Sequence, residues 1–310
     1  MLWEQLTHAV ILDQQMRVLD PVYNALLDRL AAGECTNADY ELLQSRVIAR
    51  NPAILTEDKF KKSPIIVPGN ELQTELNIMH AKAQGKETKT QILIARSRDT
   101  CSSVDLTTIR KEQLWQVIST KGGGLPGKGY LMKGMPVHLT TNYATELCLT
   151  NGSLGIITAI VCDRNEPKST EPIHVLHNLP LYVLVKFEDT KCPQLQDLEP
   201  KVIPIHPITS SFKFRFQGTP KQSSISRTQI PLVPAYAYTA YKAQGKTLES
   251  TITDLVPSQR VPMNISFAYV PLSRVRRLSD ILILRDFPPH VLQQKKTKDH
   301  IAQDKRFQQM

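Results

Sequence analysis

The most informative stretch of the sequence is Pro234-Ala-Tyr-Ala-Tyr-Thr-Ala-Tyr-Lys-Ala-Gln-Gly-Lys-Thr-Leu248. Its first part, 235–239, is short and apolar enough to be a central parallel strand. Its last part, Gly245-Lys246-Thr247, has the ending of a phosphate-binding loop, G-x-x-x-x-G-K-[ST]. Ala240, however, occupies the position of the first glycine. The stretch therefore predicts a strand and a helix start in an α/β domain, and not a phosphate-binding loop.

A second stretch also imitates such a loop, the segment G-G-G-L-P-G-K-G from Gly122 to Gly129. Gly129 stands where Ser or Thr would have to hold Mg²⁺, and Pro126 stands where the loop would have to curl. The chain also lacks a clear apolar strand that ends in Asp-Glu to hold the metal. The sequence thus predicts no metal ligands and no nucleotide site that this chain could complete by itself.

Other segments extend the α/β pattern on both sides of the central stretch. Three further runs have the length and composition of buried strands: 65–67, 265–270 and 281–284. Asp20 before Pro21 predicts a helix start, and Gly33 predicts its end. Thr36 and Asp39 predict a second helix through an approximate capping box. An amphipathic run over 2–16 begins the chain without a preceding strand, so we expect that a segment before it is missing.

Residues 150–230 have a different periodicity, typical of a small all-β domain. Four short strands are predicted there, over 155–162, 182–187, 201–208 and 211–217, and their close spacing favours a barrel-like insertion. In the last of them three phenylalanines alternate with Lys213 and Arg215. One face is then aromatic and the other cationic, which suits either a core strand with a solvated face or a nucleic-acid contact.

These patterns predict an α/β fold with one parallel sheet and a small barrel-like β insertion. The expected divisions are 1–149 for the first part of the α/β domain, 150–230 for the insertion and 231–288 for the remainder. Residues 289–310 are polar and charged, and we expect a solvated helix or a disordered tail.

Composition narrows the class of protein. The formal net charge is +9, and residues 211–310 hold 16 of the 38 Lys and Arg but only 6 of the 29 Asp and Glu. A basic segment of this size suits a nucleic acid better than a membrane surface, or is simply a solvated face. The five cysteines show no C-x₂-C spacing, which indicates neither a zinc site nor a disulfide framework and favours a reducing intracellular compartment. No stretch approaches about 20 apolar residues, so no membrane span is predicted.

Four segments together resemble a known family of motor proteins. The stretch 234–248 resembles motif V of superfamily 1 helicases, closest to the petite-integration-frequency (PIF) helicases, their Helitron-transposon relatives and the RecD-like enzymes. Ala268–Arg276 resembles motif VI, with Pro271 where the family usually has Ala or Gly, and Leu12–Arg17 resembles motif IV. Gly134–Asn142, with the Asn-Gly turn at 151–152, matches the family's approach to its inserted β-domain. The resemblance spans about residues 1–287 in the family's order. It implies that the parallel sheet is RecA-like and that an N-terminal motor domain is missing.

The resemblance implies roles for individual residues. Arg17 and Arg274 would reach the γ-phosphate of ATP as arginine fingers, since a guanidinium is a planar and permanently charged donor. Five residues would couple the nucleotide state to the DNA strand: Tyr241, Lys242, Gln244, Gly245 and Thr247. Tyr241 replaces a His that is common at its position, which leaves its role open. Arg276, Lys213 and Arg215 would contact DNA. For each of these residues the alternative is an ordinary surface or helix-start position.

The first functional hypothesis is therefore the C-terminal portion of an ATP-dependent DNA helicase, inactive alone. Its cofactors would be ATP and Mg²⁺, shared with an N-terminal RecA-like domain that is missing or separately encoded, and its partner would be single-stranded DNA. The family further implies DNA repair, recombination or telomere maintenance in a nucleus or mitochondrion.

The second hypothesis is a non-enzymatic module that binds single-stranded DNA or a protein, or a transposon-derived relic. A standalone enzyme of another kind has little support, because no His/Asp/Ser or His/Cys constellation stands out in the sequence.

Overall fold

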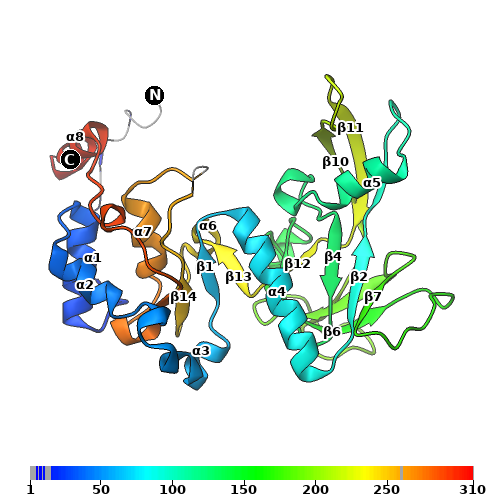
Figure 1. Ribbon diagram of the computed structural model, residues 1–310, viewed down its shortest axis with the longest axis horizontal. Helices are drawn as coiled ribbons and strands as arrows, with labels where there is room; N and C mark the ends of the chain where they lie inside the picture. The colour runs from blue at the N-terminus through cyan, green and yellow to red at the C-terminus, as the bar shows by residue number, and fades with distance from the viewer. Residues whose placement is uncertain (1–4, 6, 9, 11–14, 259–260, 310) are drawn as a thin grey trace. The chain divides into compact units, whose positions relative to one another are not determined.

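The structure is a computed structural model that describes residues 5, 7–8, 10, 15–258 and 261–309 (Figure 1). The chain forms two compact units. The α/β unit comprises Met1–Gly69 and Tyr238–Met310, and the inserted unit comprises Asn70–Ala237. The helix expected over 2–16 lies largely outside the described residues.

The insertion is longer than the expected segment 150–230, because residues 70–149 fold with it. Helix α4 (Asn70–Thr88) shows the reason. The Asn77 side chain accepts hydrogen bonds from the backbone N–H of Tyr236 and Ala237 at 2.9 and 2.8 Å, and donates one to the Ala237 carbonyl at 2.9 Å. This buried amide fixes the start of the insertion to its end, a long-range contact that no local pattern indicates.

The α/β unit is built on a four-stranded sheet in the order β13-β1-β14-β15. The strands are β13 (Ala237–Thr239), β1 (Ile65–Val67), β14 (Thr251–Thr253) and β15 (Ile281–Ile283). β1 pairs with β14, and β14 with β15, in parallel. The predicted α/β domain with a parallel sheet is thus confirmed. β1 and β15 lie within the predicted runs, whereas β14 was not predicted.

The prediction of a strand over 265–270 is wrong. It forms helix α7 (Ile265–Leu272), whose first turn is capped by Asn264 through a hydrogen bond from the Phe267 N–H to its side chain at 3.1 Å. Pro271 lies inside the helix near its end. A short apolar run fits a buried strand or a buried helix equally well, and here the Asn cap selects the helix.

Two helices of this unit begin where the capping signals predicted them. α1 (Pro21–Ala32) begins at Asp20, whose carboxylate accepts from the N–H of Val22 and Tyr23, and ends at Gly33 with φ +76°. α2 (Asn37–Gln44) has the predicted Thr36/Asp39 capping box. The apolar faces of α1, α2 and α7 share one buried cluster with β15. Further helices described in this unit are η2 (Ile48–Arg50), η3 (Pro52–Thr56), α3 (Asp58–Lys61), α6 (Ala240–Ala243), η6 (Leu278–Asp280), η7 (Pro289–Val291) and, in the predicted tail, α8 (Lys298–Gln308).

The inserted unit contains three sheets, in the orders β12-β5-β6-β8-β9, β4-β2-β7 and β10-β11-β3. Their strands are β2 (Ile92–Arg96), β3 (Arg98–Thr100), β4 (Lys128–Leu131), β5 (Pro136–Leu139), β6 (Leu154–Val161), β7 (Ile173–Val175), β8 (Tyr182–Lys186), β9 (Val202–Ile205), β10 (Ile208–Phe214), β11 (Ser223–Gln229) and β12 (Leu232–Pro234). Among the described strands, β9 does not pair back to β12, so the five-stranded antiparallel sheet is open. The expected barrel is therefore not closed. The helices of this unit are α4, α5 (Thr108–Trp115), η4 (Ser119–Lys121) and η5 (Thr145–Leu147).

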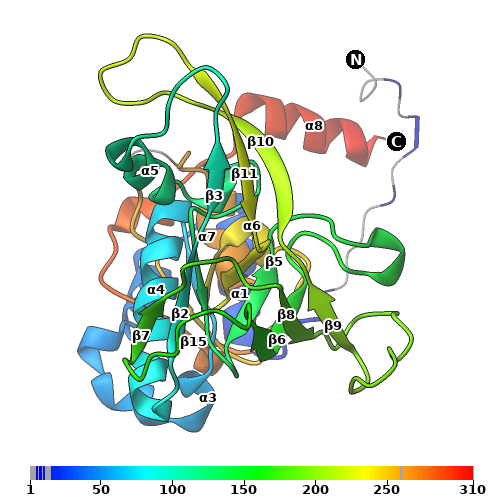
Figure 2. The same ribbon diagram turned by 90° about the vertical axis from the view of Figure 1, so that its right-hand side faces the viewer.

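Strands β10, β11 and β3 form an arm that extends beyond the other strands of the inserted unit (Figure 2). Phe212, Phe214 and Phe216 pack with Leu114 of α5 and Ile225 of β11 in a small core. The predicted division of this segment into an aromatic and a cationic face is thus confirmed, with the aromatic face in the core of the arm.

No helix among the described residues is long and apolar enough to cross a bilayer.

Candidate functional site

The loop after β13 shows how the Gly-Lys-Thr tripeptide is used. β13 leads into the single helical turn α6, and Gln244 ends that turn. Gly245 follows with φ +81°, a conformation that glycine adopts most readily. In a phosphate-binding loop the Gly-Lys-Thr peptide begins a helix, whose N-terminal N–H groups hold the phosphate. Here it follows a helix end, so these N–H groups have no such arrangement.

Arg17 joins this loop to α7 across a long sequence distance. Its Nε donates to Thr247 Oγ1 at 3.1 Å, and its Nη1 donates to the Ser273 carbonyl at 2.8 Å. Arg17, an expected arginine finger, therefore contacts Thr247, an expected coupling residue, and Ser273, which directly precedes Arg274.

Arg274 is buried, with 7% of its surface exposed. Its guanidinium donates to the Val270 carbonyl at 2.8 Å, the Ser273 hydroxyl at 2.6 Å and the Lys246 carbonyl at 3.5 Å. Burial lowers the pKa of Arg274, and the nearby charge of Arg17 lowers it further. Within the described part of the chain, neither arginine forms an ion pair with a carboxylate. Two cations held by neutral partners make a place that favours an anion.

Three further residues were expected to couple the nucleotide state to the DNA strand, and they lie on α6 or directly after it: Tyr241, Lys242 and Gln244. Tyr241 is 83% exposed on α6, and Gln244 is exposed beside it. Lys242 is half-buried, and burial lowers its pKa, with a further contribution from Lys246. The Lys246 ammonium lies over the Tyr238 ring, 5.6 Å from its centroid. This helical turn therefore has one side packed in the α/β unit and an exposed side formed by Tyr241 and Gln244.

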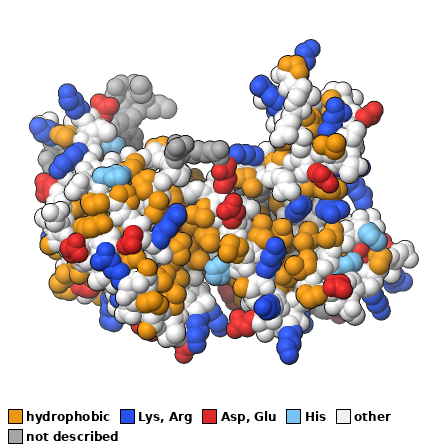
Figure 3. Space-filling view, viewed as in Figure 1, with side chains coloured by type: hydrophobic (Ala, Val, Ile, Leu, Met, Phe, Trp, Pro, Cys, Tyr) orange, Lys and Arg blue, Asp and Glu red, His pale blue; other side chains and the backbone are white. Residues whose placement is uncertain are grey.

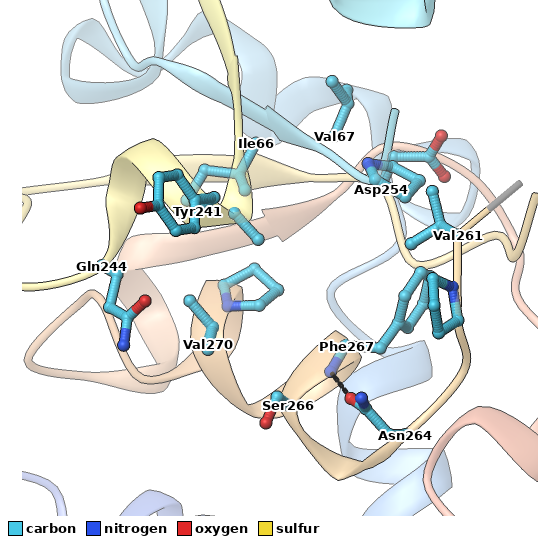
Figure 4. Close-up of a pocket in the computed structure, with 14 residues that line it drawn as sticks. Ile66, Val67, Tyr241, Gln244, Asp254, Val261, Asn264, Ser266, Phe267 and Val270 are labelled. Carbon is cyan, nitrogen blue, oxygen red and sulfur yellow. Dashed lines mark hydrogen bonds between the residues drawn. The ribbon is translucent and has the colours of Figure 1, made fainter. Parts of the chain in front are cut away.

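A cavity of about 230 Å³ opens beside α6, and the sequence did not predict it (Figure 4). It lies at the carboxyl ends of β1 and β14 and is bounded on the far side by α7. The polar members of its lining are Tyr241, Gln244, Asp254, Asn264 and Ser266. The Asp254 carboxylate is buried and is held by Arg285 at 2.8 and 3.1 Å. Cap and strand-end positions supply most of these groups, and a short polar residue there is ordinarily explained by the backbone alone.

The expected DNA contacts fall in both units. In the α/β unit Arg276 is exposed, and its carbonyl accepts from the Leu19 N–H at 2.9 Å. In the inserted unit Lys213 on β10 and Arg215 just after it are exposed, and both line a groove of about 580 Å³.

Lys121, Gln113 and Gln116 also line this groove, and so does Glu71, which pairs with Lys121 at 3.2 Å. Lysine and arginine side chains are visible on the arm in Figure 3. The groove thus carries three cations and one carboxylate, together with two amide side chains that can hydrogen-bond.

Within the described residues no group of three His, Cys, Asp or Glu side chains is placed to hold a metal ion. The five cysteines are free thiols.

Comparison with known proteins gives a likeness of fold. A structure of two coordinating Pif1 helicases that unwind forked double-stranded DNA superimposes with a TM-score of 0.63 at 18% identity, covering 97% of this chain and 55% of that one. Pif1 helicase from Candida albicans gives 0.58 at 18%, covering 94% and 59%. Bacteroides Pif1 bound to single-stranded DNA gives 0.63 at 17%, covering 96% and 56%. No family model and no curated protein sequence matches the chain.

The chain spans a little over half the length of these solved helicases. At this identity the likeness establishes the fold, and the predicted resemblance to PIF helicases is confirmed at that level.

Proposed function

We propose that this chain is the second motor half of an ATP-driven helicase that moves along single-stranded DNA. The observation that carries the proposal is the cluster of Arg17, Thr247 and Arg274, in which two guanidinium groups lie near one another with no carboxylate partner among the described residues. Such an arrangement suits the charge that develops on a transferred phosphoryl group, where an arginine finger contributes roughly 10³–10⁵ in rate.

ATP with Mg²⁺ would supply the phosphoryl group whose transfer drives movement. On this chain, Arg17 and Arg274 fit its terminal phosphate. The described residues contain no acidic cluster that fits the metal. The phosphate-binding loop and the metal-holding acids would come from a partner RecA-like domain, either on the same polypeptide or separately encoded. The chain alone is then expected to show no ATP turnover.

Thr247 would connect the phosphate site to the strand. Its hydroxyl accepts from Arg17, and the exposed Tyr241 and Gln244 lie a few residues before it on α6. A change in the position of Arg17 would reach α6 through Gly245 and Lys246. Lys242 is proposed to stabilise α6 during this movement.

The strand itself would be held by cations that neutralise its phosphates. Lys213 and Arg215 in the groove of the inserted unit, and Arg276 in the α/β unit, are the proposed contacts. Functions in DNA repair, recombination or telomere maintenance, in a nucleus or mitochondrion, belong to the same proposal through the family resemblance.

A direct test observes the two arginines. The chain is labelled with ¹⁵N-arginine and titrated with tripolyphosphate, while the Nε–H signals are followed by NMR. We expect the Arg17 and Arg274 signals to shift together, whereas Arg285, held by Asp254, keeps its signal and is an internal control. Shifts spread over all exposed arginines, or none at Arg17 and Arg274, would contradict the proposal.

A second test measures ATP hydrolysis with and without single-stranded DNA, beside Arg274→Ala. No turnover in any sample, together with DNA binding, is the expected result for a half-motor. DNA-stimulated turnover that Arg274→Ala abolishes would show that the chain holds a complete nucleotide site, and the half-motor proposal would be wrong.

The groove also favours a second candidate function, a module that binds single-stranded DNA without hydrolysis, because Lys213 and Arg215 require no nucleotide for their contacts. The tripolyphosphate titration separates the two functions. A module of this kind would bind DNA while Arg17 and Arg274 remain insensitive to polyphosphate.

A further inference from the structure

The cavity beside α6 lies at a special place in the sheet. β13 lies on one side of β1, whereas β14 and β15 lie on the other. After β1 the next strand of this sheet, β13, is added on one side of β1, and the two strands after it, β14 and β15, are added on the other side. The position between β1 and β14 is therefore a topological switch point. Val67 and Pro68 at the end of β1, and Asp254 at the end of β14, line the cavity. In open α/β sheets, ligands bind at the carboxyl ends of the strands at such a point.

The lining of the cavity indicates the chemistry of its occupant. Its floor is apolar and is formed mainly by Ile66, Phe267, Val270 and Pro271. Tyr241 and Gln244 approach from α6, and Asn264 and Ser266 from the side of α7 (Figure 4). None of the described residues that line it is Lys or Arg, and the one carboxylate, Asp254, is held by Arg285. A flat, uncharged ring with a hydrogen-bonding edge meets these conditions.

Tyr241 adds a second observation. It is a large aromatic side chain with 83% of its surface exposed, so packing within the α/β unit does not account for it. An exposed tyrosine ring at the rim of an apolar cavity offers a stacking surface, and bases of single-stranded nucleic acids stack on such rings. Gln244, on the same turn, carries an amide that can donate to and accept from the edge of a base.

We propose that this cavity receives one nucleobase of a bound single strand, stacked against Tyr241, with its edge hydrogen-bonded by Gln244 or Asn264. This inference rests on the proposed function, because its ligand is the single-stranded DNA named there. A free nucleotide could supply the same ring, but its phosphates would find no cation among the described lining residues. A strand carries its phosphates past the cavity to cations elsewhere, so only the base has to enter.

The test compares two 12-nucleotide oligomers labelled with fluorescein, oligo-dT and a strand of the same length in which every base is replaced by an abasic site. Their affinities for the full chain are measured by fluorescence anisotropy. The variants are Tyr241→Ala, Tyr241→Phe as the matched control, and Ser266→Trp, which fills the cavity and leaves Tyr241 in place. Since Tyr241 and Ser266 are both exposed, these changes are expected to leave the fold intact, as circular dichroism would verify.

We expect Tyr241→Ala and Ser266→Trp each to weaken oligo-dT binding about 10-fold, the effect of losing one base stack. Binding of the abasic strand should change less than about twofold, and Tyr241→Phe should behave as the unchanged chain. An equal loss on both strands would overturn the base pocket and leave the DNA-binding proposal standing. Displacement of oligo-dT by millimolar thymidine monophosphate would also overturn it, because the ring would then come from a free nucleotide. Failure of the unchanged chain to bind either strand would contradict the proposed function itself.

Discussion

Both units of the molecule contain a buried arginine, and the two arginines have opposite surroundings. In the inserted unit Arg227 is fully buried and forms a two-pronged ion pair with the buried Asp99, at 2.8 and 3.0 Å. It also donates to the carbonyls of Leu114 and Leu125. In the α/β unit Arg274 is nearly as buried, but its partners are two carbonyls and a hydroxyl, and its charged neighbour is Arg17.

This difference separates a structural arginine from one that has a place for a ligand. A buried charge is costly unless a partner neutralises it. Asp99 neutralises Arg227 and at the same time joins β3 to β11, which are paired in the same sheet. Arg274 and Arg17 lack such a partner among the described residues, so an anion that binds there would relieve their repulsion. The two arginines should accordingly respond in opposite ways to mutation and to phosphate.

The largest effect is expected from Asp99→Ala, which leaves Arg227 buried without its partner. The inserted unit should lose roughly 3–5 kcal/mol of stability, the usual result of breaking a buried ion pair on one side. Urea unfolding, with hydrogen exchange at β3 and β11 to locate the change, measures it. The double variant Asp99→Leu/Arg227→Met should recover much of the loss, because both charges are then removed. A loss below about 1 kcal/mol for Asp99→Ala would mean that the carbonyl bonds alone hold Arg227.

The second effect concerns Arg17 and Arg274, which have no carboxylate partner among the described residues. Phosphate at about ten times its dissociation constant should stabilise the α/β unit by about 1.4 kcal/mol. Arg17→Gln should abolish this gain. Stability without phosphate should change little, because the loss of the hydrogen bonds to Thr247 and Ser273 offsets the removed repulsion of Arg274. Arg276→Gln, an exposed arginine two residues from Arg274, is the matched control and should keep the gain. An equal response of all three proteins would reveal only the general stabilising effect of phosphate.

Much of the fold could be predicted from local signals, and the exceptions have clear physical reasons. Asp20 and Gly33 bound α1 because caps satisfy the free backbone groups of that helix locally. β14, by contrast, contains one apolar residue, Ile252, between two threonines. Those threonines are nevertheless buried, because their hydroxyls donate to the carbonyls of Pro64, just before the neighbouring strand β1, and of Ile66 within it. Such long-range satisfaction of polar groups leaves no pattern in the sequence.

The candidate site was predictable where whole motifs recur and unpredictable where single residues act. Arg17, Thr247 and Arg274 could each be singled out in advance because each stands in a segment that resembles a helicase motif, but their mutual contacts were not predicted. The cavity could not be predicted, because Asp254, Asn264 and Ser266 stand at strand ends and helix starts. Polar residues are common at such positions, since their side chains hydrogen-bond to the backbone. Arg227 was also missed, since an isolated arginine in a strand is usually exposed.

A smaller effect is expected in the groove. Lys213→Ala and Arg215→Ala should each weaken single-strand binding and each lower the slope of log affinity against log salt by about 0.7, the value for one phosphate contact. Neither change should alter stability measurably, because both side chains are exposed. Lys168→Ala, an exposed lysine outside the groove in the same unit, is the control. If Lys168→Ala changed the slope as much as the groove variants, the attraction would be diffuse and the groove would have no special part in it.

The smallest effect is expected for Arg29, an arginine that is paired but not buried. It tests whether burial of the arginine, and not the ion pair alone, determines the cost of removing its partner. Arg29 is partly exposed and donates to the Asp39 carboxylate at 2.9 Å. This bond lowers the pKa of Asp39; burial opposes the shift, and hydrogen bonds from Thr36 support it. Because the folded pKa lies below the unfolded value of about 3.9, the pair stabilises the protein fully above that pH. The stabilisation is lost as the pH falls through the folded pKa.

The urea midpoint of Asp39→Asn should therefore lie below that of the unchanged chain at pH 7, and the gap should close as the pH is lowered below about 4. Asp58→Asn, whose carboxylate is 94% exposed beside Lys61, should show no gap at either pH. The gap for Asp39 should remain well below the effect of Asp99→Ala. The Asp39 carboxylate is buried, but Arg29 is 39% exposed, so solvent screens its charge and Asp39→Asn leaves no buried cation without a partner. If Asp39→Asn were as damaging as Asp99→Ala, burial would not be what distinguishes the arginines of the two units, and the inference drawn from Arg274 would lose its basis.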